Sequence, residues 1–398
     1  MADSNLMEGR DAIPGGSFGE GSNPPDIGSD KRNRVGGYLK LVIIAASTWA
    51  AAVLLSFLAR AVPGFAESYA SVIYPLFIRT VGRIIGLLPF SVAEVLLYIL
   101  VICVIDLIIR CVSRLFLGRF AFDAAVVFIV RLAAATGIIA LVFTVFCGIN
   151  YHRNTFARNA GLTAAPSSVD ELAALYVSLA EDINEDANSV VRDGEGIFDI
   201  GMSLKECNKA CVTAMKELGQ QMSSLGGFYP QPKSVMAWQL LSYQNVTGVY
   251  SPFTVEANYN GNIPAFTLPF TICHELSHLK GYMREDEANF IGWLSCASSD
   301  EAWLRYSGNL TAFITVGNAF YAADSEAWSQ VWTQLCPSAK ADIQSNNDYW
   351  KRFEGKAAET HERVNNAYLK ANGQSDGVKS YGKMVDLMLA WRRKSAGA

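Results

Sequence analysis

Three long apolar segments dominate the first 150 residues and predict a membrane domain. Residues 41–59 contain no charged side chain, residues 89–109 carry one acidic residue near each end, and residues 132–151 are again uncharged. A helix of about 20 apolar residues is long enough to cross the hydrocarbon core of a bilayer. We therefore predict three transmembrane helices within a membrane domain of residues 38–151, with the lipid bilayer as a partner.

The stretches around these segments complete the N-terminal half. Residues 1–37 are rich in Gly, Ser, Pro and Asp, a composition typical of a disordered tail. Residues 65–88 are apolar and aromatic but include Arg79 and Arg83, which predicts a helix lying in the membrane interface. With a cytoplasmic N-terminus, seven lysines and arginines near the predicted spans lie on the cytoplasmic side and five on the opposite side. Because positive side chains accumulate on the cytoplasmic side, this count favours that orientation. Three spans then place residues 152–398 outside the cytoplasm, in a multi-pass protein of the cell membrane.

Helical periodicity dominates the remaining residues. Ser168 and Ser203 are each followed three residues later by glutamate, which is the capping box that opens a helix. Only residues 246–260, with β-branched and aromatic side chains between Gly, Pro and Asn, predict a strand or hairpin. Further helical patterns cover residues 232–244, 285–295, 300–321, 326–335, 339–369 and 378–394. The expected fold class is mainly α, with three N-terminal transmembrane helices followed by a mostly helical domain that contains a short β-hairpin or edge strand.

Composition narrows the classes of function. Residues 151–398 carry 21 basic and 27 acidic side chains, and this acidic balance excludes the basic surface that nucleic acids require. The eight cysteines include no CxxC pair, and three of them lie within or beside the apolar segments. Such a pattern does not form a disulfide framework, so we expect buried thiols that act as small apolar side chains.

The sequence HELSH at residues 274–278 is the candidate chemical site. In a helix, His274 and His278 project from the same face one turn apart, so both imidazoles can reach one metal ion. Glu275 is rotated by about 100° and can instead hold a water that the metal polarises. The pattern therefore supplies two zinc ligands and a general base in five residues. A charged helix without metal is the alternative interpretation of so short a motif.

Catalytic zinc keeps three protein ligands and one open position, so a third ligand must follow. Metzincins have histidine at the position of Arg284, and an arginine cannot bind a cation, which excludes that class. Gly281 can end the first helix, and the acidic run after it offers Glu285, Asp286 and Glu287 on a second helix. The spacing alone leaves open which carboxylate completes a site for one Zn²⁺ per chain.

The run REDEANF resembles the ExxA[DN] element that follows HExxH in gluzincin-type membrane peptidases. This resemblance implies Glu285 as the third ligand, Ala288 as the small residue and Asn289 as the group that orients a ligand histidine. Those families usually have aspartate where Asn289 stands, and the separation from the second histidine is shorter here. Glu287 therefore remains the alternative ligand.

Longer segments resemble a family of bacterial membrane proteins known as domain of unknown function 3810, which carries HExxH. The resemblance rests on the three spans and on the segments YSPFTVEANYN, LPFTICHELSHLKGYMREDEANF and LKANGQSDGVKSYGKMVDL. It implies a gluzincin-like zinc metallopeptidase, with a zincin-like domain over residues 152–398.

Other residues are candidates for contact with a substrate. Glu256, Ala257 and Asn258 lie in the predicted strand, which as an edge strand could pair with an extended peptide; a structural hairpin is the alternative. Tyr381 could donate its hydroxyl to an oxyanion, with packing as its alternative role. Only residues 266–273 before HExxH are apolar, too few to cross a bilayer, so the site belongs outside the membrane.

These observations predict a membrane-anchored zinc metallopeptidase in which Glu275 activates water for attack on a peptide bond. We expect its substrate to be a protein or peptide near the membrane surface. One alternative is a non-catalytic, zinc-stabilised membrane sensor or assembly factor that has a peptidase fold. Another alternative is a metal-dependent amidase that acts on cell-wall material.

Overall fold

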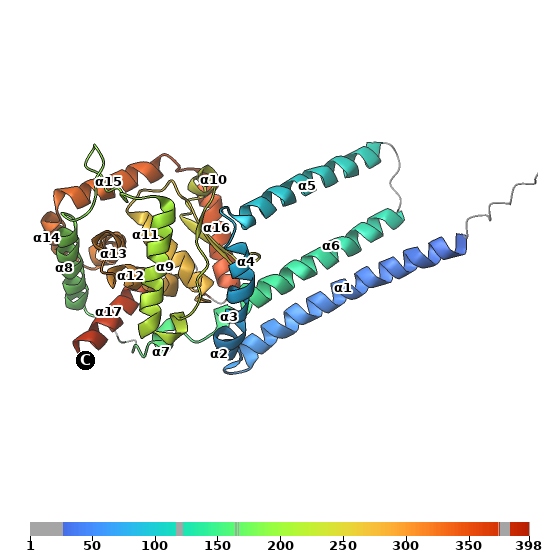
Figure 1. The fold of residues 1–398 in the computed structure, drawn as a ribbon, viewed down its shortest axis with the longest axis horizontal. Coiled ribbons are helices and arrows are strands. Elements are labelled where there is room, and N and C mark those ends of the chain that lie inside the picture. The colour runs from blue at the N-terminus through green and yellow to red at the C-terminus, as the bar shows by residue number, and fades with distance from the viewer. Residues whose placement is uncertain are drawn as a thin grey trace, which may run out of the picture.

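The protein, described by a computed structural model, consists of a helical body from which three long helices project (Figure 1). The described residues are 27–116, 122–163, 165, 167–372, 374 and 383–397. The projecting helices are α1 (Ile27–Ala61), α5 (Val92–Phe116) and α6 (Phe122–Phe143). Three segments, Gly36–Ala61, Val92–Arg114 and Ala125–His152, are helices long and apolar enough to cross a membrane. The prediction of three membrane-length helices is therefore confirmed.

The first helix begins earlier than the sequence predicted. The tail was expected to extend to residue 37, but α1 already begins at Ile27. Once the apolar segment has nucleated a helix, each further residue adds one backbone hydrogen bond, and the polar residues before the span are compatible with that extension. Residues 1–26 of the predicted tail lie outside the described residues.

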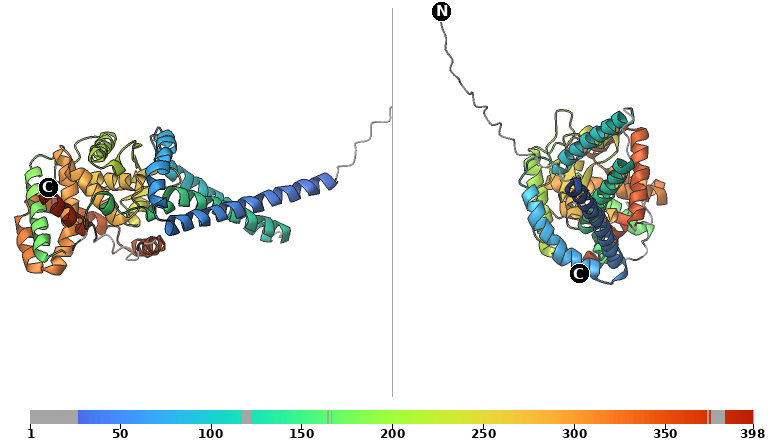
Figure 2. Two further views of the ribbon diagram at one scale, coloured as in Figure 1. Left: turned by 90° about the horizontal axis from the view of Figure 1, so that it is seen from below. Right: turned by 90° about the vertical axis from the view of Figure 1, so that its right-hand side faces the viewer.

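Residues 65–85 form the helix that was predicted between the first two spans. It is divided into α2 (Phe65–Ser68), η1 (Tyr69–Ile73), α3 (Tyr74–Phe77), η2 (Ile78–Gly82) and α4 (Arg83–Ile85), where η1 and η2 are π turns. Its buried residues Ala66, Ala70, Tyr74 and Ile78 recur every four positions and face the body, as Figure 2 shows for the whole segment. A π turn inserts an extra residue into a helix, which keeps positions spaced by four on one face.

The body is almost entirely helical. Its helices are α7 (Phe156–Asn159), α8 (Val169–Asp186), α9 (Leu204–Gln221), α10 (Trp238–Tyr243), α11 (Thr267–Leu279), α12 (Glu285–Ala297), α13 (Ala302–Ala323), α14 (Ser325–Gln334), α15 (Pro337–Lys351), α16 (Lys356–Ala371) and α17 (Lys383–Ala396). The buried helix α13 packs against α8, α11, α12 and α14. The capping boxes at Ser168 and Ser203 are both formed and open α8 and α9 as predicted.

Two elements within the body differ from the sequence-based prediction. The expected helix over residues 232–244 begins with a short strand, and only its second half is helical, as α10. The expected helix over residues 339–369 is two helices, which are separated at residues 352–355, where Gly355 has φ 154°. Buried residues before residue 152, such as Tyr74 and Cys147, belong to the same apolar core as the later helices.

The small sheet contains β1 (Lys233–Ser234), β2 (Gly248–Ser251) and β3 (Glu256–Tyr259) in the order β1-β3-β2. β2 and β3 form an antiparallel hairpin, as predicted, and β1 pairs with β3 in parallel. Glu256, Ala257 and Asn258 therefore lie in the central strand and are buried. Their prediction as a substrate-binding edge strand is wrong, because β1 covers the side of β3 that an isolated hairpin would leave open.

Glu256 instead anchors the second apolar helix to the sheet. Its carboxylate lies 2.6 Å from Nζ of Lys233 and accepts hydrogen bonds from the backbone N–H groups of Val92 and Ala93, at 3.1 and 2.8 Å. A carboxylate at a helix N-terminus satisfies free N–H groups and interacts favourably with the helix dipole. Glu94 of α5 reciprocates by accepting hydrogen bonds from the backbone N–H groups of Met236 and Ala237.

The eight cysteines all lie among the described residues and are free. Five of them are buried, namely Cys147, Cys207, Cys211, Cys273 and Cys296. The absence of disulfides agrees with the prediction, and the expected burial holds for these five; Cys103 and Cys111 are exposed on α5, and Cys336 is half-buried.

Candidate metal centre

The HELSH motif lies in the second half of α11, the best-buried helix of the site. Pro269 occurs in the first turn, where a missing N–H is tolerated, and Gly281 follows the helix with φ 85°, a left-handed conformation that favours glycine. His274 and His278 lie on one face, with ring centroids 4.7 Å apart. The predicted same-face arrangement of the two imidazoles is thus present in the structure.

The turn at Gly281 reverses the chain and leads into α12, whose first residue is Glu285. The Nε2 atom of His274 lies 3.4 Å from Oε2 of Glu285, and Nε2 of His278 lies 3.6 Å from Oε1 of the same carboxylate. Each residue offers one donor atom, and these three atoms all lie within 4.8 Å of one another. Zinc ligands at about 2.0–2.1 Å in a tetrahedron are roughly 3.3 Å apart, so this spacing fits one zinc ion.

A close approach of the two helices makes this spacing possible. A Cβ atom at Gly292 of α12 would lie 3.2 Å from the backbone nitrogen of His274 and 3.3 Å from its Cα. Glycine at position 292 therefore allows α11 and α12 to pack closely at this level, two turns after Glu285.

The orientation of His278 suits metal binding. Its Nδ1 atom lies 2.8 Å from the carbonyl oxygen of Tyr282, to which an Nδ1–H group donates. This tautomer leaves the lone pair of Nε2 directed at Glu285 and His274. Burial lowers the pKa of His278 to about 4, so the imidazole is neutral at pH 7, as a ligand must be.

His274 is buried beside acidic and amide groups. Burial acts to lower its pKa, but the hydrogen bond and charge of Glu285 outweigh this effect, so the pKa of His274 is raised. Asn289 of α12 also contributes to raising that pKa. Nδ1 of His274 is nevertheless buried without a hydrogen-bond partner, so the orienting role expected for Asn289 stays a prediction.

Glu275 is packed beneath the edge strand β2. Its side chain is almost completely buried, and a Cβ atom at Gly248 of β2 would lie only 2.4 Å from Oε1 of Glu275. The other oxygen, Oε2, is buried without a hydrogen-bond partner. Burial raises the pKa of Glu275 to about 8, which means that the carboxyl group keeps its proton at neutral pH unless a cation lies nearby. An unpartnered carboxylate oxygen of this kind is costly, and a water between it and a metal ion would satisfy it.

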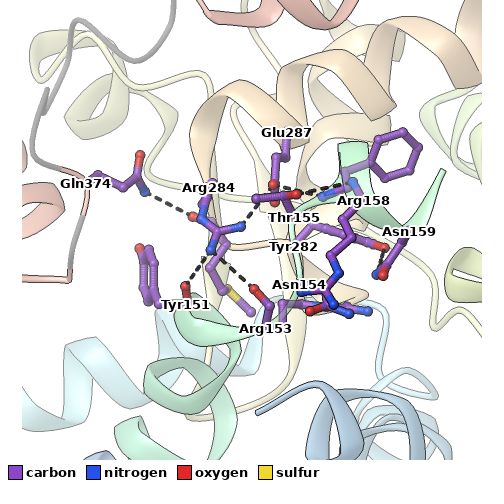
Figure 3. Close-up of polar contacts among 12 residues, drawn as sticks. Tyr151, Arg153, Asn154, Thr155, Arg158, Asn159, Tyr282, Arg284, Glu287 and Gln374 are labelled. Atoms are coloured by element: carbon purple, nitrogen blue, oxygen red, sulfur yellow. Dashed lines mark hydrogen bonds and ion pairs between the residues drawn. The ribbon is translucent and has the colours of Figure 1, made fainter. Parts of the chain in front are cut away.

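Glu287, the alternative ligand, does not belong to the group of donor atoms that His274, His278 and Glu285 form. Its Oε1 atom accepts hydrogen bonds from the backbone N–H of Phe156 at 2.9 Å and from Nη1 of Arg284 at 3.0 Å (Figure 3). The structure therefore brings Glu285, and not Glu287, to His274 and His278. Glu287 serves to hold the start of α12 against the segment that follows the third apolar helix.

Two arginines, which the sequence did not single out for this role, fix the loop between α11 and α12. Arg284 donates to the carbonyl oxygens of Tyr151 and Arg153, each at 3.2 Å (Figure 3). The buried guanidinium of Arg153 donates to the carbonyl oxygen of Lys280 at 3.0 Å and lies 4.1 Å from the centre of the Tyr282 ring. The end of the third apolar helix is thus tied directly to the chain that carries Glu285.

Tyrosines near the centre differ from the one predicted. Tyr381 lies outside the described residues. Tyr368 of α16 accepts a hydrogen bond from the hydroxyl of Tyr151 at 3.1 Å. Burial raises the pKa of Tyr368, and the charge of Glu285 is a smaller cause of the same increase. No local pattern in the sequence distinguishes Tyr368 from other tyrosines.

The three candidate ligands are mostly buried. The side chains of His274, His278 and Glu285 are 12%, 10% and 16% exposed, so each keeps a small solvent-accessible area. Among the described residues no fourth His, Cys, Asp or Glu donor joins this group. The residues present therefore fit a metal ion with one open coordination position.

Comparison with known protein families gives one match. The family described as "Protein of unknown function (DUF3810)" matches residues 69–389, which include both helices of the candidate centre. No curated protein and no solved structure is similar to the chain.

Proposed function

We propose that this chain, which belongs to the DUF3810 family of unknown function, is a membrane-anchored zinc-dependent metallopeptidase. The observation that carries the proposal is the convergence of two imidazole nitrogens and one carboxylate within 4.8 Å, on partly exposed side chains next to the buried Glu275. His274, His278 and Glu285 would hold one Zn²⁺ in this arrangement.

The chemistry follows from the positions of these side chains. Zinc bound there would lower the pKa of a bound water and polarise the carbonyl of a peptide. Glu275 accepts a proton as the water oxygen bonds to the carbonyl carbon, and it returns a proton to the amine nitrogen as the C–N bond breaks. Its free Oε2 atom and its burial, which raises its pKa to about 8, suit a group that must both take and release a proton near neutral pH.

A peptide could be held along β2. β2 is at the end of the sheet order, so within the described residues one of its edges has no strand partner. A Cβ atom at Gly248 in this strand would lie 2.4 Å from Oε1 of Glu275. An extended segment that adds to such an edge receives main-chain hydrogen bonds and runs past the general base. The edge-strand role expected for residues 256–258 thus moves to β2.

A purely structural zinc site is less consistent with these features. Structural zinc is usually held by four protein ligands, whereas the described residues supply three. A sensor or assembly factor would also gain nothing from an unpaired, buried carboxylate such as Glu275. A metal-dependent amidase of cell-wall material would use the same groups, so only the products distinguish it from a peptidase.

The decisive comparison is between the full-length protein and its Glu275→Gln variant, with Glu195→Gln in an exposed turn as the control. We expect both variants to retain zinc, while Glu275→Gln loses hydrolysis of a mixed peptide library by at least about 100-fold. Cell-wall fragments are tested beside the peptides to identify the bond that is cut. Hydrolysis that is unchanged in Glu275→Gln would refute the catalytic proposal.

We also propose that the N-terminus is cytoplasmic and the body extracytoplasmic, on the basis of the lysine and arginine distribution. A reporter that is active only in the cytoplasm, fused after Ala398, should give no signal in cells. A signal from that fusion would contradict this topology without affecting the metal chemistry.

A further inference from the structure

The candidate centre lies at the end of the third apolar helix. The hydroxyl of Tyr250 in β2 donates to the carbonyl oxygen of Phe146 at 3.3 Å, and the Sγ atom of Cys147 lies 3.7 Å from Sδ of Met283. Tyr250 is two residues from Gly248, and Met283 is two residues from Glu285. Residues on both sides of the centre thus contact the last turns of this helix.

These contacts place the centre beside the base of the third apolar helix. The apolar segment Ala125–His152 ends six residues after Phe146, and its last turns contribute Cys147, Ile149 and Tyr151 to the apolar core of the body. The helix therefore leaves the bilayer before these buried residues. The groups that would bind zinc lie at the end of the body from which the apolar helices project.

An exposed apolar rim surrounds the same end of the body. Leu87, Leu88 and Phe90 precede α5, Met236 and Leu240 lie at α10, and Phe253 lies in the β2–β3 turn. All six are exposed, from 39% for Phe90 to 79% for Leu87. The rim is continuous with α5, because Glu94 of α5 bonds to the backbone of Met236 and Ala237. Side chains of this kind at a membrane-proximal surface contact the lipid interface.

The apolar helices are also unequally packed beside this rim. α1 and α6 pack together, with Nε1 of Trp49 donating to the carbonyl oxygen of Ala133 at 3.1 Å. Within the described part of the chain, α5 makes no comparable contact with α1 or α6, and it stands apart from them in Figure 1. One side of the membrane region next to the centre is therefore lined by a helix with free apolar faces.

We propose, on the basis of the proposed peptidase function, that the substrate is itself a membrane-spanning polypeptide, cut just outside the bilayer. Its span lies in the membrane beside α5, and the segment that emerges from the lipid passes over the apolar rim onto β2. Because the centre lies near the membrane surface, it would cut peptide bonds close to the span of the substrate and not bonds in domains far from the membrane.

The test uses the full-length, zinc-loaded protein in vesicles of phosphatidylethanolamine and phosphatidylglycerol. Each probe has one transmembrane span followed by a randomised extramembrane segment of about 30 residues, and mass spectrometry identifies the bonds that are cut. The same randomised segments without a span serve as soluble probes. Because about ten extended residues reach at most ~35 Å, we expect cleavage to cluster within roughly the first ten residues after the span.

The outcomes separate this inference from the proposed function. Cleavage spread evenly along the anchored segment, or soluble probes cut as fast as anchored ones, would overturn the substrate class and leave the peptidase proposal intact. Zinc-loaded protein that cuts neither probe contradicts the peptidase proposal and this inference with it.

A pair of substitutions tests the rim itself. Leu240→Asp places a charge on the rim, whereas Val169→Asp places one on a similarly exposed apolar position of α8, at the far side of the body in Figure 1. We expect Leu240→Asp to slow cleavage of anchored probes by about tenfold, with little effect on soluble peptides, and Val169→Asp to change neither. Equal effects of the two substitutions on anchored probes would contradict a role for the rim.

Discussion

Gly248→Ala is the most informative single substitution, because it acts on Glu275, the proposed general base, without touching a proposed metal ligand. The added Cβ atom would lie 2.4 Å from Oε1, 2.7 Å from Cγ and 2.8 Å from Cδ of Glu275. Ordinary contacts between such atoms begin near 3.4 Å, so the carboxylate or the strand must move by roughly 1 Å. Glu275 is buried and therefore has little space into which it can retreat.

The expected result is a large loss of activity with a modest loss of stability. A displacement of about 1 Å at a catalytic group can lower the rate roughly 100-fold, whereas overpacking typically costs about 1–3 kcal/mol of stability. We therefore predict a fall of about 100-fold in kcat for peptide hydrolysis, with zinc content unchanged. Peptide hydrolysis, metal analysis and thermal unfolding of the purified protein measure these three quantities.

Gly261→Ala is the matched control for this substitution. Its Cβ atom would lie 2.2 Å from Oγ of Ser234, which also requires a side chain to move, but its close neighbours are Ser234 and Leu204 and not Glu275. We expect Gly261→Ala to lower stability by no more than Gly248→Ala does and to keep its activity. Full activity in Gly248→Ala would refute the position that we assign to β2, and equal losses of activity in both variants would show only a general effect of overpacking.

Three further predictions concern the ligands, the metal and the sheet. Glu285→Gln should weaken zinc binding by at least about 100-fold in competition with a chromophoric chelator. Glu287→Gln should leave zinc affinity unchanged and cost about 1–3 kcal/mol of stability, because the charge of Arg284 loses its carboxylate partner. The reverse pattern would identify Glu287 as the ligand. Removal of zinc by a chelator should lower the unfolding temperature. Excess zinc at about 100 times its Kd should then restore about 2.7 kcal/mol of unfolding free energy. An unfolding temperature that does not depend on zinc would contradict a resident ion. Glu256→Gln should destabilise the protein by about 3–5 kcal/mol, because it leaves the charge of Lys233 buried and unpaired. A change in KM without loss of stability would instead support a substrate role for β3.

Local patterns in the sequence predicted the elements that local interactions determine. The capping boxes at Ser168 and Ser203 involve residues three positions apart, and both helices begin where they were expected. The same reasoning placed His274 and His278 on one face of a helix, since one turn of backbone fixes their relation. The three apolar helices were also predictable, because length and hydropathy alone determine whether a helix can span a bilayer.

Other features depend on contacts between distant segments. The choice between Glu285 and Glu287 rests on the rotation of α12 about its axis, which the turn at Gly281 and the contact of Gly292 with His274 determine. The sequence contained both glycines, but no pattern showed which helix face they would bring to the histidines. The clamp of Arg284 on the backbone of residues 151 and 153 joins positions more than 130 apart in the sequence and has no local signature.

The sheet shows the same limit. A strand of two residues, such as β1, is too short to produce an alternating pattern, yet it decides that β3 is central and β2 is at the edge. The hairpin itself was predictable from residues 246–260, whereas the edge available to a substrate was not.

X-ray absorption spectroscopy at the zinc edge of the purified full-length protein is the most direct test of the metal centre. His274, His278, Glu285 and a water predict one zinc per chain with only nitrogen and oxygen neighbours, at about 2.0–2.1 Å. Sulfur neighbours at about 2.3 Å would place the metal at cysteines instead, and protein that binds no zinc at all would contradict the centre itself.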